Sequence, residues 1–347
     1  MQISSNYNDI KTHNFTKPGS YEWWYFDFMD ENSGYSFVVI FFTSFLFSPR
    51  YIKKTLTEND FNINDHCAVN VCVYRDNKPV DYLLVEYDRH DLKFTDSENE
   101  YSINIAQNQI TYVTTDEGIK VYLNCNVIDP GSGKKIKIKC EYIPVVNNLE
   151  NKILNSETDF PDKWLPVYPK CKVSGKMYLD KSSKSQRSVK KVNIEGTGYN
   201  DKNWSDKPVY KDIDDWIWGR CHIREYTVIL FKILYSQKTF SKFLIYKNDK
   251  LISDVNDAEF ISDFKKNYWR LQYPSLLNIK SGENILTVNN NNLIDNGPFY
   301  IRFISDFNLK INNESLNGKG VFEIIKPQRL LSKFLHPFIN LRIKTKE

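Results

Sequence analysis

The sequence has few cysteines, no long apolar run and almost no excess of charge. Six Cys among 347 residues are too few for a disulfide scaffold, and they form no CxxC pair and have no His at a zinc-like spacing. The longest apolar segment, residues 35–47, contains Ser and Thr and is shorter than the roughly 20 residues of a membrane-spanning helix. The 47 Lys and Arg against 43 Asp and Glu give no indication of a nucleic-acid partner.

Other absences bear on the chemistry and the compartment. The sequence has no GxSxG motif, and no histidine pair is spaced for one metal site. The first twenty residues are polar and contain no apolar stretch of signal-peptide length. We therefore expect a cytoplasmic protein with reduced, mostly buried thiols, without a metal or another cofactor.

What the sequence has in excess is aromatic side chains. The 22 Phe, 22 Tyr and 7 Trp make up 15% of the chain, and 41% of all residues are hydrophobic. That fraction is ample for a packed core and excludes general disorder. The aromatic residues either fill this core or line a binding site, and composition alone does not decide between the two.

Short strands separated by turn residues recur along the chain and indicate an all-β protein. Residues 68–74 and 80–87 flank one turn, and residues 119–128 and 135–143 flank another that contains Gly and Pro. Connections this short join antiparallel strands. Residues 257–266 are a candidate for one short helix.

A polar stretch at residues 146–161 divides the chain into two halves. Each half opens with a cluster of aromatic and acidic residues and continues as a series of short strands. We predict an N-terminal β domain at 1–160 and a C-terminal β domain at 161–347, packed together as antiparallel barrels or sandwiches.

The first aromatic cluster is YEWWYFDF at residues 21–28. On a strand, Glu22 and Trp24 face one side, whereas Trp23, Tyr25 and Asp27 face the other. Each face therefore brings a carboxylate next to bulky rings, which tends to raise its pKa and makes it a candidate acid. The alternative is a structural carboxylate that accepts hydrogen bonds within the core.

Two further clusters lie in the second half of the chain. The segment EGTGYNDKNW, residues 195–204, combines glycines with a dense set of hydrogen-bonding groups, but it does not complete a phosphate-binding loop. The segment DDWIWGR, residues 214–220, places two tryptophans and an arginine on one strand face. Such an arginine can stack on the indoles or hold a carboxylate.

These clusters, together with WLP at 164–166 and GKGVFE at 318–323, resemble the carotenoid 1,2-hydratase/AttH-like family. The resemblance implies two lipocalin-like β domains, and the family extends to Diels-Alderases and to polyene or terpenoid cyclases. The ordered motifs span residues 21–323. We therefore expect a hydrophobic small-molecule substrate, bound in a pocket between the two domains.

Departures from the family pattern affect the expected activity. The middle motif of the hydratases typically reads GYHDHNWG, and here Asn200 and Lys202 stand where the histidines would be, with Ser205 in place of the last glycine. The strand after WGR, residues 227–232, lacks the acid that the family tends to have there. Because addition of water to an alkene requires a positioned acid, these departures favour a Diels-Alderase-like cyclase or isomerase.

The sequence leaves two alternatives to the cyclase. One is a protonation-driven terpenoid cyclase or hydratase, and the other is a carrier that binds apolar molecules without catalysis. The candidate catalytic residues are Glu22, Tyr199, Asp201, Lys202 and Asn203. The candidate substrate-binding residues are Trp23, Trp24, Tyr25, Trp204, Trp216, Trp218 and Arg220.

The last segment, residues 326–347, mixes Lys and Arg with Leu, Phe and Ile. It is interpreted as a strand or short helix packed on the second domain, because its two prolines limit helix length. The alternative is an amphipathic edge that makes weak contact with a membrane surface.

Overall fold

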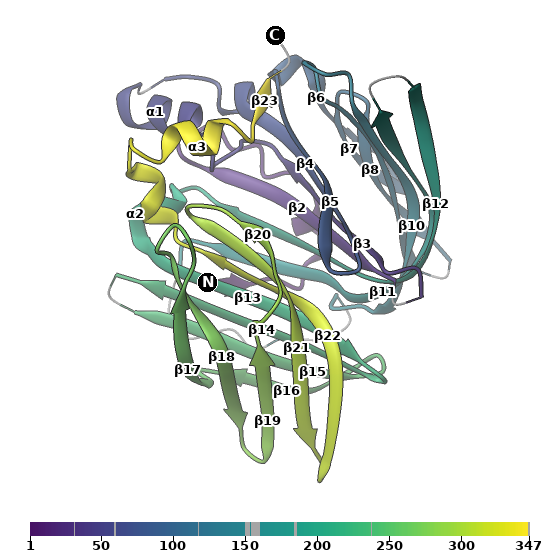
Figure 1. Cartoon of the computed structure of the whole chain (residues 1–347), viewed down its shortest axis with the longest axis vertical. Helices are drawn as coiled ribbons and strands as arrows, with labels where there is room; N and C mark the ends of the chain where they lie inside the picture. The colour runs from purple at the N-terminus through teal and green to yellow at the C-terminus, as the bar shows by residue number, and fades with distance from the viewer. Residues whose placement is uncertain are drawn as a thin grey trace.

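Two strongly curled antiparallel sheets make up the protein (Figure 1). The structure is a computed structural model that describes residues 1–345 except 31, 59, 117, 150–152, 154–159, 184–185 and 237. The all-β class and the two lipocalin-like halves expected from the motifs are confirmed by this architecture. No helix among the described residues is long and apolar enough to cross a membrane.

The first sheet has 13 strands. Its strands follow the order β23 (Lys344–Thr345), β5 (Lys78–Tyr87), β4 (Cys67–Arg75), β3 (Tyr35–Phe42), β2 (Tyr21–Met29), β12 (Gln186–Ser205), β11 (Lys163–Ser183), β10 (Lys135–Val146), β9 (Gly118–Ile128), β8 (Asn108–Thr115), β7 (Glu100–Ile105) and β6 (Leu92–Asp96), with β1 (Gln2–Ile3) beside β11. Among the described residues, β1 with β11 and β23 with β5 form short parallel pairs.

The second sheet has 10 strands. Their order is β16 (Lys250–Asn256), β15 (Thr239–Lys247), β14 (Tyr226–Tyr235), β13 (Ile213–Ile223), β22 (Glu314–Ile325), β21 (Tyr300–Ile311), β19 (Asn284–Asn289), β18 (Gln272–Ser281) and β17 (Glu259–Lys266), with β20 (Leu293–Asn296) beside β21. The helices are α1 (Pro49–Thr57), α2 (Val209–Asp212) and α3 (His336–Asn340), and the 3₁₀ turns are η1 (Tyr7–Ile10), η2 (Ile63–His66), η3 (Arg89–Asp91) and η4 (Pro327–Leu331).

The sheets differ from the sequence prediction at two places. Strands β11 and β12 pair with β10 and β2, so the first sheet continues to Ser205, beyond the expected boundary at residue 160. The polar stretch at 146–161 lies largely outside the described residues. The short helix predicted at 257–266 is wrong, because β17 occupies 259–266 and its backbone pairs with β18 along its whole length.

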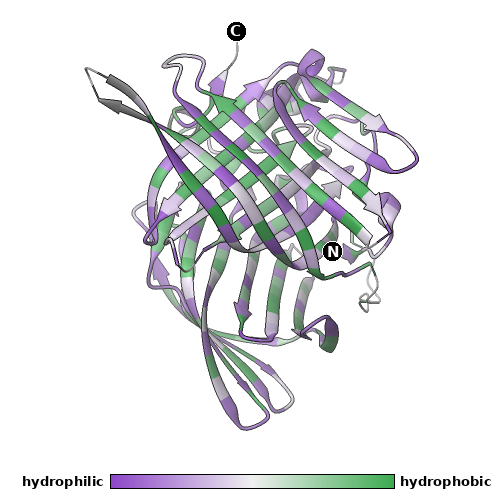
Figure 2. Cartoon of the chain, turned by 90° about the vertical axis from the view of Figure 1, so that its right-hand side faces the viewer, coloured by the Kyte–Doolittle hydropathy of each residue, from purple (hydrophilic) through white to green (hydrophobic). Residues whose placement is uncertain are grey.

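Alternation of side chains along the strands produces three apolar cores. Hydrophobic and hydrophilic residues form alternating bands along each curled sheet in Figure 2. One core fills the first sheet and includes Trp24, a second fills the second sheet and includes Ile217, and a third lies between the sheets. We call the third core the seam; Trp23 from β2 and Trp216 from β13 meet in it with ring centroids 5.7 Å apart.

All six cysteines are buried and none forms a disulfide. Cys72 lies in the seam, and Cys67, Cys125, Cys140 and Cys171 lie in the core of the first sheet. The expectation of free, buried thiols is therefore confirmed. Burial raises the pKa of Cys72 above its ordinary value, which keeps that thiol neutral.

Candidate functional site

Strands β2 and β12 place their odd-numbered side chains on the seam. The two strands pair in register, so that Asp201 lies opposite Tyr25 and Asn203 lies opposite Trp23. Tyr199 belongs to the same face of β12 and is fully buried in the seam. The glycine that precedes it allows the close packing, because a Cβ at Gly198 would lie 2.6 Å from the carbonyl oxygen of Asp27.

Strands β13, β14 and β22 of the second sheet supply the opposite wall. Tyr25 and Trp218 meet edge to face at 5.3 Å between ring centroids, which joins the two walls. Between them lies a cavity of about 30 Å³, enough for about one or two water molecules. The cavity is lined by Trp23, Tyr25, Asp201, Asn203, Trp216, Trp218, Phe231, Glu323 and Ile325.

The Asp201 carboxyl group lines this cavity and is surrounded by hydrogen-bond donors. Its Oδ2 accepts hydrogen bonds from the Tyr199 hydroxyl at 2.8 Å and from Trp164 Nε1 at 3.0 Å, and its Oδ1 accepts one from the Asn203 amide at 3.1 Å. Burial raises the pKa of Asp201 to about 8; the Tyr199 and Trp164 hydrogen bonds oppose this rise and the charge of Glu323 adds to it. The carboxyl group therefore keeps its proton at neutral pH.

Two polar atoms of residues that line the cavity, one from each wall, have no hydrogen-bond partner among the described residues. They are Trp218 Nε1, which can only donate, and Asn203 Oδ1, which can only accept. Both residues line the same small cavity. Because a buried polar group without a partner is costly, these two atoms are candidates to hold a water molecule or a hydroxyl group.

Charged groups at the edge of the cavity are held in pairs. Glu323 accepts a hydrogen bond from the Tyr25 hydroxyl at 3.1 Å and pairs with Arg302 Nε at 2.7 Å. Arg220 of β13 forms a bidentate pair with Asp27 of β2, with Nε 2.9 Å from Oδ2. Arg220 thus joins the two sheets beside the cavity and does not line it.

Four sequence candidates lie on the other face of β2 and β12. Lys202 Nζ is 2.6 Å from Glu22 Oε1 and lies over the rings of Trp24 and Trp204 at 4.8 and 5.1 Å. Burial by itself would raise the pKa of Glu22, but Lys202 and His13 bring it below its ordinary value. Glu22 and Lys202 therefore form a buried ion pair on the face away from the seam. Lys202 and Asp201 are neighbours on β12, so their side chains point to opposite faces of the sheet.

The structure thus brings together six of the candidates at the cavity, with Tyr199 directly behind Asp201. It adds three lining residues and one partner that the sequence candidates did not include. Glu323 and Trp164 stand in motifs that were recognised, whereas Phe231 and Ile325 are ordinary apolar strand residues without a distinguishing signal. The added residues are Trp164, Phe231, Glu323 and Ile325.

A second apolar cavity continues the seam toward α3. It measures about 70 Å³, and Phe42, Phe47 and Ile339 are among its lining residues. Phe42 of this cavity pairs in register with Trp23 of the first, and Arg302 of this cavity pairs with Glu323 of the first. The two cavities are therefore lined by neighbouring residues on paired strands. We call these two spaces the inner cavity, beside Asp201, and the outer cavity, beside α3.

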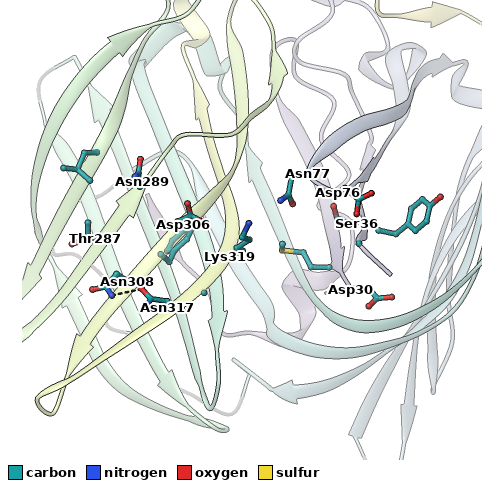
Figure 3. A pocket seen from close by; sticks show the side chains of 16 residues that line it. Asp30, Ser36, Asp76, Asn77, Thr287, Asn289, Asp306, Asn308, Asn317 and Lys319 are labelled. Carbon is teal, nitrogen blue, oxygen red and sulfur yellow. Dashed lines mark hydrogen bonds between the residues drawn. The ribbon is translucent and has the colours of Figure 1, made fainter. Parts of the chain in front are cut away.

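A larger cleft of about 880 Å³ opens between the sheets elsewhere, and most of its lining residues are polar or charged. Figure 3 shows its side chains coming from both sheets, with the Asn308 amide donating to Asn317 Oδ1 at 2.8 Å. None of the candidate residues lines it. Among the described residues, no group of three His, Cys, Asp or Glu side chains is placed to hold a metal ion.

Comparison with known proteins gives a family match and several fold matches. The model of the family described as carotenoid hydratase CrtC matches residues 39–347, which confirms the resemblance indicated by the motifs. A protein named hydroxyneurosporene dehydrogenase from Chlorobaculum tepidum is 24% identical over 99% of this chain and 92% of its own length. An acyclic carotenoid 1,2-hydratase from Thiocapsa roseopersicina is 23% identical over 62% of this chain and 48% of its own length.

Two solved structures show the same fold at low sequence identity. The structure of CghA with Sch210972 has a TM-score of 0.61 and 12% identity and covers 89% of each chain. The structure of a putative AttH from Nitrosomonas europaea has a TM-score of 0.60 and 14% identity, covering 92% of this chain and 96% of that chain.

Proposed function

The chain belongs to the carotenoid hydratase CrtC family, and we propose that it adds water to a terminal carbon–carbon double bond of a hydrophobic polyene, with Asp201 as the proton donor. The observation that carries this proposal is a carboxyl group that holds its proton near neutral pH within an aromatic cavity. We therefore rank hydration above the cyclase. The missing histidines favoured a cyclase because the sequence lacked a positioned acid, and Asp201 can serve as that acid.

Protonation of an alkene carbon needs an acid that is neutral at the working pH and is close to an apolar substrate. Asp201 meets both requirements, since burial raises its pKa to about 8 and its neighbours in the cavity are aromatic. The Asn203 amide N–H donates to Asp201 Oδ1, which leaves Asn203 Oδ1 without a partner among the described residues.

The cavity walls suit the cation that protonation creates. The rings of Trp23, Trp216 and Trp218 surround the space beside Asp201, and aromatic faces attract a positive charge. The position between Trp218 Nε1 and Asn203 Oδ1 would hold the attacking water, with the indole donating to its oxygen and the amide accepting one of its protons.

The reaction balances without a further reagent. The Asp201 proton forms a C–H bond with one alkene carbon as the π bond breaks, which leaves a cation on the neighbouring carbon. The water oxygen bonds to that carbon, and one water proton passes to the Asp201 carboxylate. The carboxyl group is thereby regenerated, and the net change is addition of one water molecule.

The substrate class is supported by the family and by the shape of the seam. One relative is named an acyclic carotenoid 1,2-hydratase, and aromatic neighbours join the linings of the inner and outer cavities, because Trp23 pairs in register with Phe42 and Phe47 contacts both rings. The inner cavity of about 30 Å³ is smaller than the end of a polyene, so substrate entry requires these side chains to move apart.

The test is turnover of an acyclic carotenoid in D₂O and in H₂¹⁸O, followed by mass spectrometry. We expect one deuterium on carbon and one ¹⁸O in the new hydroxyl group. Asp201→Asn should lower turnover by about 10²–10⁴-fold. The matched control is Asp162→Asn, because Asp162 is also buried and accepts from Tyr21 and Tyr235 at 2.5 and 2.9 Å but does not line the cavity.

Other outcomes would contradict the proposal. A cyclic product without deuterium on carbon would indicate the pericyclic alternative. Tight binding of the carotenoid with no product would indicate a carrier. Unchanged turnover in Asp201→Asn would exclude this residue as the acid.

A further inference from the structure

Exposed aromatic and aliphatic side chains gather on the C-terminal segment and on the turn between β17 and β18. Tyr268 is 85% exposed, Phe334 76% and Leu341 74%, which is unusual for side chains of this size. Ring contacts join the two segments, with Trp269 and Phe338 5.0 Å apart and Phe334 and Phe338 5.9 Å apart between centroids. We call these five residues the aromatic patch.

The patch lies in a strongly basic setting. Residues 265–272 and 326–345 contain eight Lys and Arg and no Asp or Glu. Lys326 pairs with Asp215 and Arg342 with Asp295, whereas Lys265, Lys266, Arg270, Lys333 and Lys344 are exposed. This charge is complementary to an anionic surface, and the aromatic and basic combination is typical of segments that lie in a membrane interface.

The other face of the same segment lies against the outer cavity. Ile339 and Ile343 are buried and line the outer cavity, while Phe338 and Leu341 point away from the core. Helix α3 lies beside α1, and β23 pairs with β5 at the same end of the molecule (Figure 1). The Arg342 guanidinium fixes this arrangement through Asp295 at 2.8 Å and the Tyr82 ring at 4.2 Å.

We propose that the aromatic patch docks the protein on an anionic lipid bilayer, and that a polyene passes from the bilayer beside α3 into the outer cavity. The second half of this inference rests on the proposed function, because it assumes a polyene substrate. A polyene resides in the hydrocarbon region of a bilayer, and a patch that enters the headgroup boundary would place the outer cavity against that region.

Vesicle binding without substrate tests docking independently of turnover. The intact chain is co-sedimented with vesicles of phosphatidylcholine and phosphatidylglycerol in equal amounts, and with phosphatidylcholine alone. We expect binding to the anionic vesicles that weakens with added salt, and a loss of at least about tenfold in Tyr268→Ser/Phe334→Ser. The matched control is Val189→Ser, because Val189 is 61% exposed on β12 and lies outside the patch.

The results that would overturn the inference are distinct. Absence of vesicle binding by the intact chain, or equal binding by the double variant, would exclude the patch as a membrane site. A change in oligomeric state of the double variant in size-exclusion chromatography, with vesicle binding unchanged, would indicate a contact between copies of this chain instead.

A turnover assay separates docking from chemistry. With carotenoid supplied in vesicles the double variant should turn over at least about tenfold more slowly, and with carotenoid in detergent micelles it should match the intact chain. Loss of turnover in both conditions would overturn the role of the patch in delivery. Absence of turnover by the intact chain in both conditions would refute the proposed function and leave the vesicle-binding result standing.

Discussion

Replacement of Asp201 by Asn should change how the stability of the protein depends on pH. Burial raises the pKa of Asp201 from its ordinary 3.8 to about 8 in the folded chain. Below pH 3.8 both the folded and the unfolded chain hold this proton. Between that pH and about 8 the unfolded chain releases it and the folded chain retains it, so the free energy of unfolding falls as pH rises.

The magnitude follows from the difference between the two pKa values. Each pKa unit corresponds to about 1.4 kcal/mol. The free energy of unfolding of the wild-type chain therefore falls by about 6 kcal/mol between low pH and pH 8 through Asp201. The asparagine side chain of the Asp201→Asn variant would be neutral at every pH and nearly the same shape. The free energy of unfolding of this variant, relative to wild type, should therefore rise by about 3 kcal/mol between pH 5 and pH 7.

Urea unfolding at pH 5, 6, 7 and 8, followed by tryptophan fluorescence, measures this difference. Asp263→Asn is the control, because Asp263 is exposed on β17 and the substitution likewise replaces one carboxylate by an amide. A constant difference between wild type and Asp201→Asn across this pH range would refute the reasoning. It would mean that Asp201 is already ionised in the folded chain at these pH values and cannot act as a proton donor.

Two further substitutions test the water position and the pair that joins the sheets. Trp218→Phe removes an indole donor with no partner among the described residues, so carotenoid turnover should fall about tenfold; unchanged turnover would exclude a role in holding water. Arg220→Met leaves the Asp27 carboxylate buried and unpaired, so urea unfolding should report a loss of about 3–5 kcal/mol. Arg220→Met/Asp27→Asn should recover much of that loss, and no recovery would mean that Arg220 acts chiefly through packing.

Local patterns predicted the strands and their faces well. The alternation in residues 21–28 separated Trp24 from Trp23 and Tyr25, and the structure places them in different cores. The same reasoning applied to β12 separates Lys202 from Asp201, although both were grouped as catalytic candidates. The short helix predicted at 257–266 was wrong, because backbone pairing with β18 outweighs local preference.

The sequence by itself determined the all-β class, the family and the faces of the strands, because these depend on residue order and on a period of two along each strand. The inner cavity was decided only by the tertiary structure. The pKa of Asp201 is raised because β13, β14 and β22 of the other sheet exclude water from it, and the buried cations Arg220 and Arg302 are already paired with Asp27 and Glu323. Burial and pairing of this kind depend on contacts between residues far apart in the chain, which no local pattern encodes.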